Sequence, residues 1–172
     1  MPVMRLNHAV LYVRDAARSA AFYGDVLGFA RLMELPGAVF LQAPGSTNDH
    51  DLALFGIGEA AAASDAGRCT VGLYHLAWEV ETLADLKRIA AKLTDAGALV
   101  GASDHSTTKA LYAADPDGIE FEVSWLVPAD RITDEVRAGR TSIKPLDIDR
   151  EIAAYGADTR GGVGISHALP VG

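Results

Sequence analysis

Short apolar runs separated by polar turns make up the first 57 residues of the chain. Four of these runs predict strands, at residues 6–13, 29–35, 38–42 and 51–57. Between the first two runs, residues 16–27 follow a helical pattern. Asp15 is the expected N-cap of this helix and Gly28 its C-cap. The predicted order is strand, helix and three strands.

The second half of the chain repeats this order. Its predicted strands span residues 73–80, 99–101, 110–114 and 119–125, with a helix at 83–96. Thr82 is the expected N-cap, and Asp115-Pro116-Asp117-Gly118 has the composition of a hairpin turn. His8 and His75, which are 67 residues apart, occupy the same position in the two first strands. One βαβββ unit is therefore expected to occur twice.

The pattern divides the chain into four parts. These are a first module at 1–57, a linker at 58–72, a second module at 73–126 and a C-terminal tail at 127–172. In the tail, residues 130–140 and 147–155 predict short helices, and the Gly-rich residues 159–172 predict an extended arm on a neighbouring subunit. Because the tail is poor in core residues, we expect a homodimer.

Composition and charge exclude several classes of partner. The chain has 172 residues, of which 49% are hydrophobic, as in an ordinary globular protein. A net charge of -8 argues against nucleic acid and anionic membranes as partners. Cys69 is the only cysteine, so no disulfide can form within the chain. The first residues lack a secretion signal and no apolar run is long enough to span a membrane, so we expect a cytoplasmic protein.

Strand parity brings metal-binding residue types onto one face. In the second half, His75 lies on the less apolar face of its strand, and Glu120 and Glu122 lie on the less apolar face of the last strand. An unpaired buried carboxylate is costly, and a cation on that face would offset the cost. Two neutral imidazoles, His8 and His75, with one of these carboxylates would leave open positions on a divalent metal.

These features together resemble the vicinal oxygen chelate superfamily, which includes glyoxalase I, fosfomycin and bleomycin resistance proteins, and extradiol ring-cleaving dioxygenases. The resemblance covers roughly residues 5–126, and its most specific part is the Asp-Pro-Asp-Gly turn with Glu122 four residues after the glycine. It implies an α+β fold in which two βαβββ modules form an incomplete curved β-barrel. It also implies that His8, His75 and Glu122 bind the metal.

The resemblance also favours one branch of the superfamily. Glyoxalase-like members add a fourth ligand at the position that matches Ala53, unless the alignment shifts by two residues to Asp51. The absence of a fourth ligand at position 53 favours the three-ligand site of extradiol dioxygenases, which use Fe(II). His50 resembles the acid–base histidine of these enzymes, and its odd spacing from Ala53 requires it to approach from a bulge or loop. Tyr112, ten residues before Glu122, resembles the tyrosine that contacts the bound catecholate.

The expected substrate is a small aromatic or vicinal-oxygen molecule. Two other functions on the same scaffold stay open: a glyoxalase-like lyase, isomerase or thiol transferase using Ni, Zn or Mn, and a drug-binding resistance protein. His105 is expected in a loop near the mouth of the pocket, and Lys109 as a solvated lysine. Glu79 and Glu120 are expected to line a wet rim.

Overall fold

The computed structural model describes residues 3, 5–65 and 69–162. The chain forms two compact units. One contains Met1–Thr70 and Asp115–Ile119, and the other contains Val71–Ala114 and Glu120–Gly172. Helices and strands occur in both units, which confirms the predicted α+β class.

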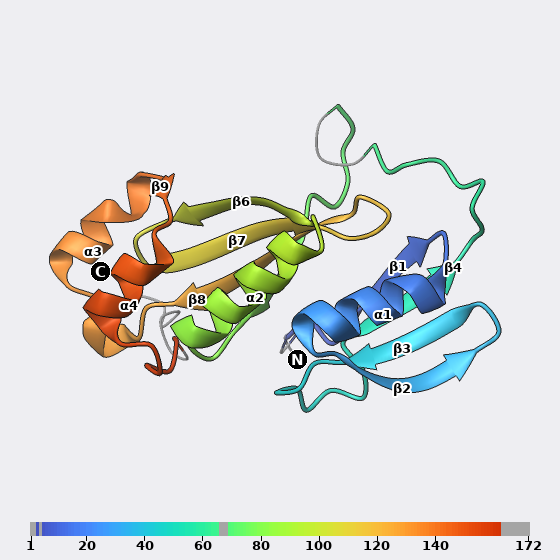
Figure 1. The fold of residues 1–172 in the computed structure, drawn as a ribbon, viewed down its shortest axis with the longest axis horizontal. Helices are drawn as coiled ribbons and strands as arrows, with labels where there is room; N and C mark the ends of the chain where they lie inside the picture. The colour runs from blue at the N-terminus through green and yellow to red at the C-terminus, as the bar shows by residue number, and fades with distance from the viewer. Residues whose placement is uncertain (1–2, 4, 66–68, 163–172) are drawn as a thin grey trace. The chain divides into compact units, whose positions relative to one another are not determined.

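The first unit contains a four-stranded sheet and one helix (Figure 1). Its elements are β1 (Ala9–Val13), α1 (Ala16–Leu27), β2 (Ala30–Leu35), β3 (Ala38–Gln42) and β4 (Leu52–Gly56). The strand order is β1-β4-β3-β2, with β1 parallel to β4 and the other neighbours antiparallel. The order of these elements along the chain confirms the predicted succession of strand, helix and three strands.

The core of the first unit lies between α1 and the sheet. Leu11 and Val13 of β1 and Leu54 of β4 are buried with Tyr23 of α1. The helix begins where expected, because the Asp15 side chain accepts hydrogen bonds from the free N–H groups of the first turn. It ends at Gly28, whose φ of 79° is the left-handed conformation that glycine adopts without a steric penalty.

The second unit repeats the arrangement and adds a short edge strand (Figure 1). Its elements are β5 (Leu76–Glu79), α2 (Leu83–Asp95), β6 (Leu99–Asp104), β7 (Thr108–Ala114), β8 (Glu120–Leu126) and β9 (Lys144–Pro145). The strand order is β5-β8-β7-β6-β9. On β8, Phe121, Val123 and Trp125 are buried as the parity argument predicted.

Both histidine-bearing strands begin later than predicted. The strand expected at 6–13 begins at Ala9, and the strand expected at 73–80 begins at Leu76. The first backbone pairs join Ala9 to Leu52 and Leu76 to Phe121. Apolar residues before these points have no neighbouring strand to pair with, so pattern alone overestimates the strands. His8 therefore lies one residue before β1, and His75 one residue before β5.

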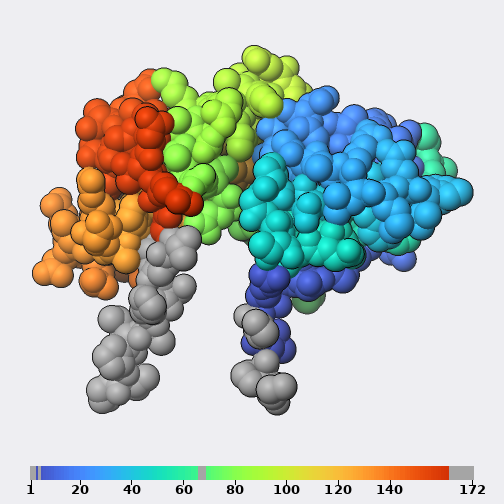
Figure 2. Space-filling model, turned by 90° about the horizontal axis from the view of Figure 1, so that it is seen from below, coloured from blue at the N-terminus to red at the C-terminus, as the bar shows by residue number. Residues whose placement is uncertain are grey.

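The tail packs on the second unit. It contains η1 (Ala129–Arg131), α3 (Asp134–Ala138), η2 (Gly139–Thr141) and α4 (Ile148–Tyr155). The red surface of α4 lies against the green surface of α2 in Figure 2, and the two helices are in contact. The backbone of residues 159–162 runs beside Trp125, whose indole N–H donates to the Thr159 carbonyl. The described part of the predicted arm thus contacts its own chain, and residues 163–172 lie outside the described residues.

This packing removes the reason for expecting a homodimer, which stays a prediction. Among the described residues, we find no helix with the length and apolar character required to cross a membrane.

Candidate functional site

His8 and His50 form a pair in the first unit. Their ring centroids are 4.4 Å apart, and the rings are tilted by 36°. His8 Nδ1 lies 2.7 Å from the side-chain oxygen of Asn7. If this oxygen accepts the Nδ1 proton, the Nε2 lone pair of His8 is free to bind a metal.

His50 lies in the loop directly before β4, so it does approach His8 from a loop. Its Nδ1 is 2.9 Å from a carboxylate oxygen of Asp49, which orients the ring and leaves Nε2 available. The ring also packs edge-on against Phe40 at a centroid distance of 5.2 Å. An oriented imidazole with one free nitrogen is suited to proton transfer.

Asp51, the alternative fourth ligand, is already bonded within its own loop. Its carboxylate accepts hydrogen bonds from the Ser46 hydroxyl, the Asn48 amide and the backbone N–H of Ala43, at 2.7 to 2.8 Å. Burial alone would raise the pKa of this carboxyl, but these hydrogen bonds outweigh it and lower the pKa. These bonds indicate that Asp51 holds the loop between β3 and β4 in shape. Ala53, the other position considered, is buried in β4 and has no ligand atom.

His75 and Glu122 form the matching pair in the second unit. His75 Nε2 lies 3.3 Å from a Glu122 carboxylate oxygen. The pair forms because β5 runs parallel to β8, in a register that aligns Ala77, two residues after His75, with Glu122. His75 lies one residue before β5, and the extended chain that leads into this strand brings its imidazole to the Glu122 carboxylate.

Tyr112 and His105 extend this pair into a hydrogen-bonded chain. Tyr112 of β7 lies directly opposite Glu122 of β8. Burial, the Glu122 charge, the neighbouring Tyr74 and a hydrogen bond to Glu122 raise the pKa of the Tyr112 phenol. His105 Nε2 is 2.8 Å from the Tyr112 hydroxyl. If the single phenol proton is donated to Glu122, His105 Nε2 is the donor to the Tyr112 oxygen.

The spacing of His75 and Glu122 fits a shared cation. Donor atoms on adjacent positions of one metal, each about 2.1 Å from it, lie about 3 Å apart. The other nitrogen of His75, Nδ1, is buried and has no hydrogen-bond partner among the described residues. In most metal-binding histidines, the nitrogen that does not bind the metal donates a hydrogen bond to an acceptor. Within either unit, the described residues contain no group of three or more His, Cys, Asp or Glu placed to hold a metal. The ligand set of His8, His75 and Glu122 therefore stays a prediction that spans the two units.

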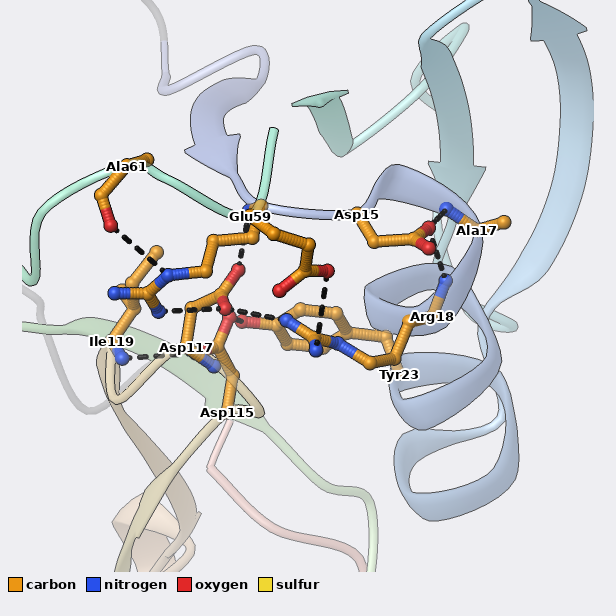
Figure 3. Close-up of polar contacts among 10 residues, drawn as sticks. Asp15, Ala17, Arg18, Tyr23, Glu59, Ala61, Asp115, Asp117 and Ile119 are labelled. Atoms are coloured by element: carbon orange, nitrogen blue, oxygen red, sulfur yellow. Dashed lines mark hydrogen bonds and ion pairs between the residues drawn. The ribbon is translucent and has the colours of Figure 1, made fainter. Parts of the chain in front are cut away.

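The Asp-Pro-Asp-Gly turn has a structural role in the first unit (Figure 3). Asp117 accepts hydrogen bonds from the backbone N–H and guanidinium of Arg14 and from the guanidinium of Arg18. Asp115 accepts one from the buried Tyr23 hydroxyl at 3.3 Å, and burial raises the pKa of the Asp115 carboxyl. The turn that identifies the resemblance thus also packs against α1.

Three contacts were not anticipated from the sequence. These are the orienting oxygens of Asn7 and Asp49 and the bond from His105 to Tyr112. A signal for the first two exists, since each histidine directly follows a side chain with an acceptor oxygen. Lys109 was wrongly expected to be solvated. It is 3% exposed and paired with Asp104 and Glu151.

Comparison with known proteins finds two dioxygenases of similar sequence. The chain is 31% identical over 118 residues to the catechol-2,3-dioxygenase of Bacillus subtilis (strain 168), covering 69% of this chain and 40% of that protein. It is 32% identical over 133 residues to the biphenyl-2,3-diol 1,2-dioxygenase 3 of Rhodococcus globerulus, covering 76% of this chain and 68% of that protein. The chain therefore spans well under half the length of the first relative.

A solved structure and a family model complete the comparison. The crystal structure of a glyoxylase/bleomycin resistance protein/dioxygenase domain from Frankia sp. EAN1pec superposes with a TM-score of 0.60 at 25% identity, covering 72% of this chain and 98% of that one. Residues 5–123 match the model of the Glyoxalase/Bleomycin resistance protein/Dioxygenase superfamily. This range contains His8, His50, His75 and Glu122, and both βαβββ units except the last three residues of β8. The chain belongs to the Glyoxalase/Bleomycin resistance protein/Dioxygenase superfamily.

Proposed function

We propose that the protein is an Fe(II)-dependent extradiol dioxygenase that cleaves the ring of a catecholic substrate. The observation that carries the proposal is the grouping of His75 and Glu122 with Tyr112 and His105 in the second unit. Two relatives whose names state dioxygenase activity on catechol and biphenyl-2,3-diol support it. Since the superfamily's name also covers glyoxalases and resistance proteins, membership alone does not select this reaction.

The metal would be held by His8, His75 and Glu122. Asn7 would fix the tautomer of His8 so that Nε2 faces the metal. Two neutral imidazoles and one carboxylate are suited to Fe(II), which would supply the redox chemistry between O₂ and an electron-rich ring. Three protein ligands leave positions open for small molecules.

His50 would act as the acid–base residue. With Asp49 at Nδ1, Nε2 can take a proton from a substrate hydroxyl and return it as the ring opens. Tyr112, whose raised pKa keeps the phenol protonated at neutral pH, would donate a hydrogen bond to a substrate oxygen in place of its bond to Glu122. His105 would hold the Tyr112 hydroxyl in position through Nε2.

The alternative on this scaffold is a glyoxalase-like lyase or isomerase using Ni, Zn or Mn. The buried Ala53 and the internally bonded Asp51 supply no fourth ligand, and this favours the dioxygenase. A drug-binding protein without a metal is disfavoured by the pairing of His75 with Glu122.

Metal analysis and oxygen uptake test the proposal. Protein purified without air should contain iron, or accept Fe(II), and should consume O₂ with catechol or biphenyl-2,3-diol to give a yellow ring-opened product. Glu122→Ala should lose the metal, whereas Glu120→Ala, a carboxylate two residues earlier on β8, should retain it. His50→Ala should retain the metal and lower kcat by about 10²–10⁴-fold.

Two results would contradict the proposal. Iron-loaded protein that consumes no O₂ with any catechol, but is active as a lyase with Ni or Zn, would select the alternative. Equal metal content in Glu122→Ala and the unchanged protein would remove the ligand set itself.

A further inference from the structure

The turn between β6 and β7 presents His105 to Tyr112, and its backbone is unusual. Ser106, which follows His105, has a φ of 68°, a left-handed conformation that a residue with a Cβ seldom adopts. Such a conformation costs free energy and persists only when surrounding contacts hold it. The N–H of Ser106 donates to the Asp104 carboxylate at 2.7 Å, and the N–H of Thr107 donates to the His105 carbonyl.

The tail supplies some of the contacts that hold this turn. The Ser106 hydroxyl donates to the carbonyl of Val136 in α3 at 2.7 Å. At the end of α3, Gly139 lies so close to Ser106 that there is no room for a side chain at position 139. A Cβ at position 139 would lie 2.5 Å from the Ser106 hydroxyl oxygen and 3.0 Å from its Cβ. The backbone of Lys144 in β9 also lies opposite Asp104, at the end of β6, in the antiparallel pairing of these strands.

A charge cluster around the buried Lys109 joins the same turn to α4. Lys109 Nζ lies 2.6 Å from Asp104 and 2.9 Å from Glu151 of α4. Arg150 lies 3.0 Å from Glu151 and 3.5 Å from Asp104. Lys109, Asp104 and Glu151 are buried, and Arg150, whose side chain is 58% exposed, supplies the second positive charge that balances the two carboxylates. Lys109 lies three residues from Tyr112 on β7 and so points to the opposite face of the strand, away from the candidate site.

We propose that Lys109 and the tail segment Ala129–Tyr155 position His105 for its bond to Tyr112. Lys109 is a positioning residue: it acts through Asp104, which in turn binds the backbone of the His105 turn. The segment acts through α3 on Ser106 and through α4 on Lys109. The catalytic purpose of this placement rests on the proposed function, but the placement does not.

The sharpest test is Gly139→Ala. Position 139 has a φ of -65°, which alanine adopts freely, so the substitution acts only by displacing Ser106. We expect the side-chain ¹⁵N resonances of His105 to shift in the substrate-free protein, and the amide of Thr107 to exchange faster. The control is Gly45→Ala, where a Cβ meets nothing within 4 Å. Lys109→Met should have the same effect, with Lys87→Met, which removes an exposed ion pair to α4, as its control.

Activity adds a readout that general destabilisation would not produce. Gly139→Ala should lower kcat by about 10- to 100-fold in the unchanged protein and have no further effect in a His105→Ala background. An equal loss in both backgrounds would overturn the proposal, as would unshifted His105 resonances in Gly139→Ala. If Lys109→Met fails to fold, Gly139→Ala decides alone. A shift of His105 in a protein without dioxygenase activity would uphold the positioning role and reject the proposed function.

Discussion

Asn7 and Asp49 each place an oxygen beside Nδ1 of the histidine that follows them. The two distances are 2.7 and 2.9 Å, and both leave Nε2 as the reactive nitrogen. His75 differs, since the residue before it is Tyr74, whose ring packs on the imidazole at 4.7 Å. No amide or carboxylate oxygen directly precedes His75 in the chain, and its contacts include the Tyr74 ring and the Glu122 carboxylate, 3.3 Å from Nε2.

Removal of the Asn7 oxygen should weaken metal binding. Asn7→Leu is expected to lower affinity for Fe(II) or a Zn(II) probe by about 10–100-fold, because His8 loses the acceptor that fixes its tautomer. Asn7→Asp, which keeps an acceptor oxygen, should retain most of the affinity. Competition with a coloured chelator measures both. Equal affinities in the two variants would exclude this role.

Asp51 should contribute to stability rather than to metal content. Asp51→Asn replaces an oxygen that accepts the Ala43 N–H, so we expect a loss of about 1–3 kcal/mol in the free energy of unfolding by urea, with unchanged metal binding. Asp49→Asn, at a side chain that is 95% exposed, should change stability by less than about 0.5 kcal/mol. Loss of metal in Asp51→Asn would restore Asp51 as a ligand.

The Asp51 carboxyl also makes the free energy of unfolding depend on pH, with a sign that follows from its pKa. Its pKa is lowered in the folded state from an ordinary value of 3.8. Its contribution is therefore complete above that value and is lost as the pH falls through the lower folded pKa. Urea unfolding between neutral pH and pH 3 should show a smaller acid-induced loss for Asp51→Asn than for the unchanged protein. A parallel pH profile would contradict this.

At the scale of elements, the turn after β7 carries the most specific part of the sequence pattern. Gly118 has a φ of 82° and donates its N–H to the Asp115 carbonyl, as expected of the predicted turn. The packing of this turn on α1 was not visible from spacing (Figure 3). Arg14 and Arg18 lie about a hundred residues away in the chain, and only the fold brings them to Asp117.

Asp117→Ala should destabilise the protein by about 2–4 kcal/mol in urea unfolding. The side chain is 6% exposed, and its removal takes away the carboxylate that accepts from the Arg14 N–H and from the guanidinium groups of Arg14 and Arg18. Glu59→Ala removes an exposed partner of Arg18 at 3.7 Å and should cost less than about 0.5 kcal/mol. Similar costs for the two variants would show that the turn is not held by Asp117.

At the scale of the whole molecule, the proposed metal site depends on both units. His8 belongs to the first, and His75 and Glu122 to the second. His8→Ala and His75→Ala should each lose most of their bound metal, because two remaining ligands hold a divalent ion weakly. An equimolar mixture should recover neither metal nor activity if one chain supplies all three ligands. Recovery on mixing would instead show that two chains share the site.

Local chemistry made much of the fold predictable. Helix α1 matched its expected bounds because Asp15 and Gly28 satisfy its end groups locally. The repeat of βαβββ order followed from apolar periodicity, which reports the face that each element buries. The α+β class and the family follow from these features and from the Asp-Pro-Asp-Gly turn. Strand starts and the edge strand β9 were missed, since a strand exists only where a neighbour pairs with it.

The site divides in the same way. Residue types and spacing singled out His8, His50, His75, Tyr112 and Glu122 as candidates. Only the register of β5, β7 and β8 brought Glu122 to His75 and Tyr112, and only the turn geometry joined His105 to Tyr112. Sequence determines which side chains a strand offers to a face, because side chains alternate along it. Which of them meet depends on pairing between strands distant in the chain, and that is decided by the tertiary structure.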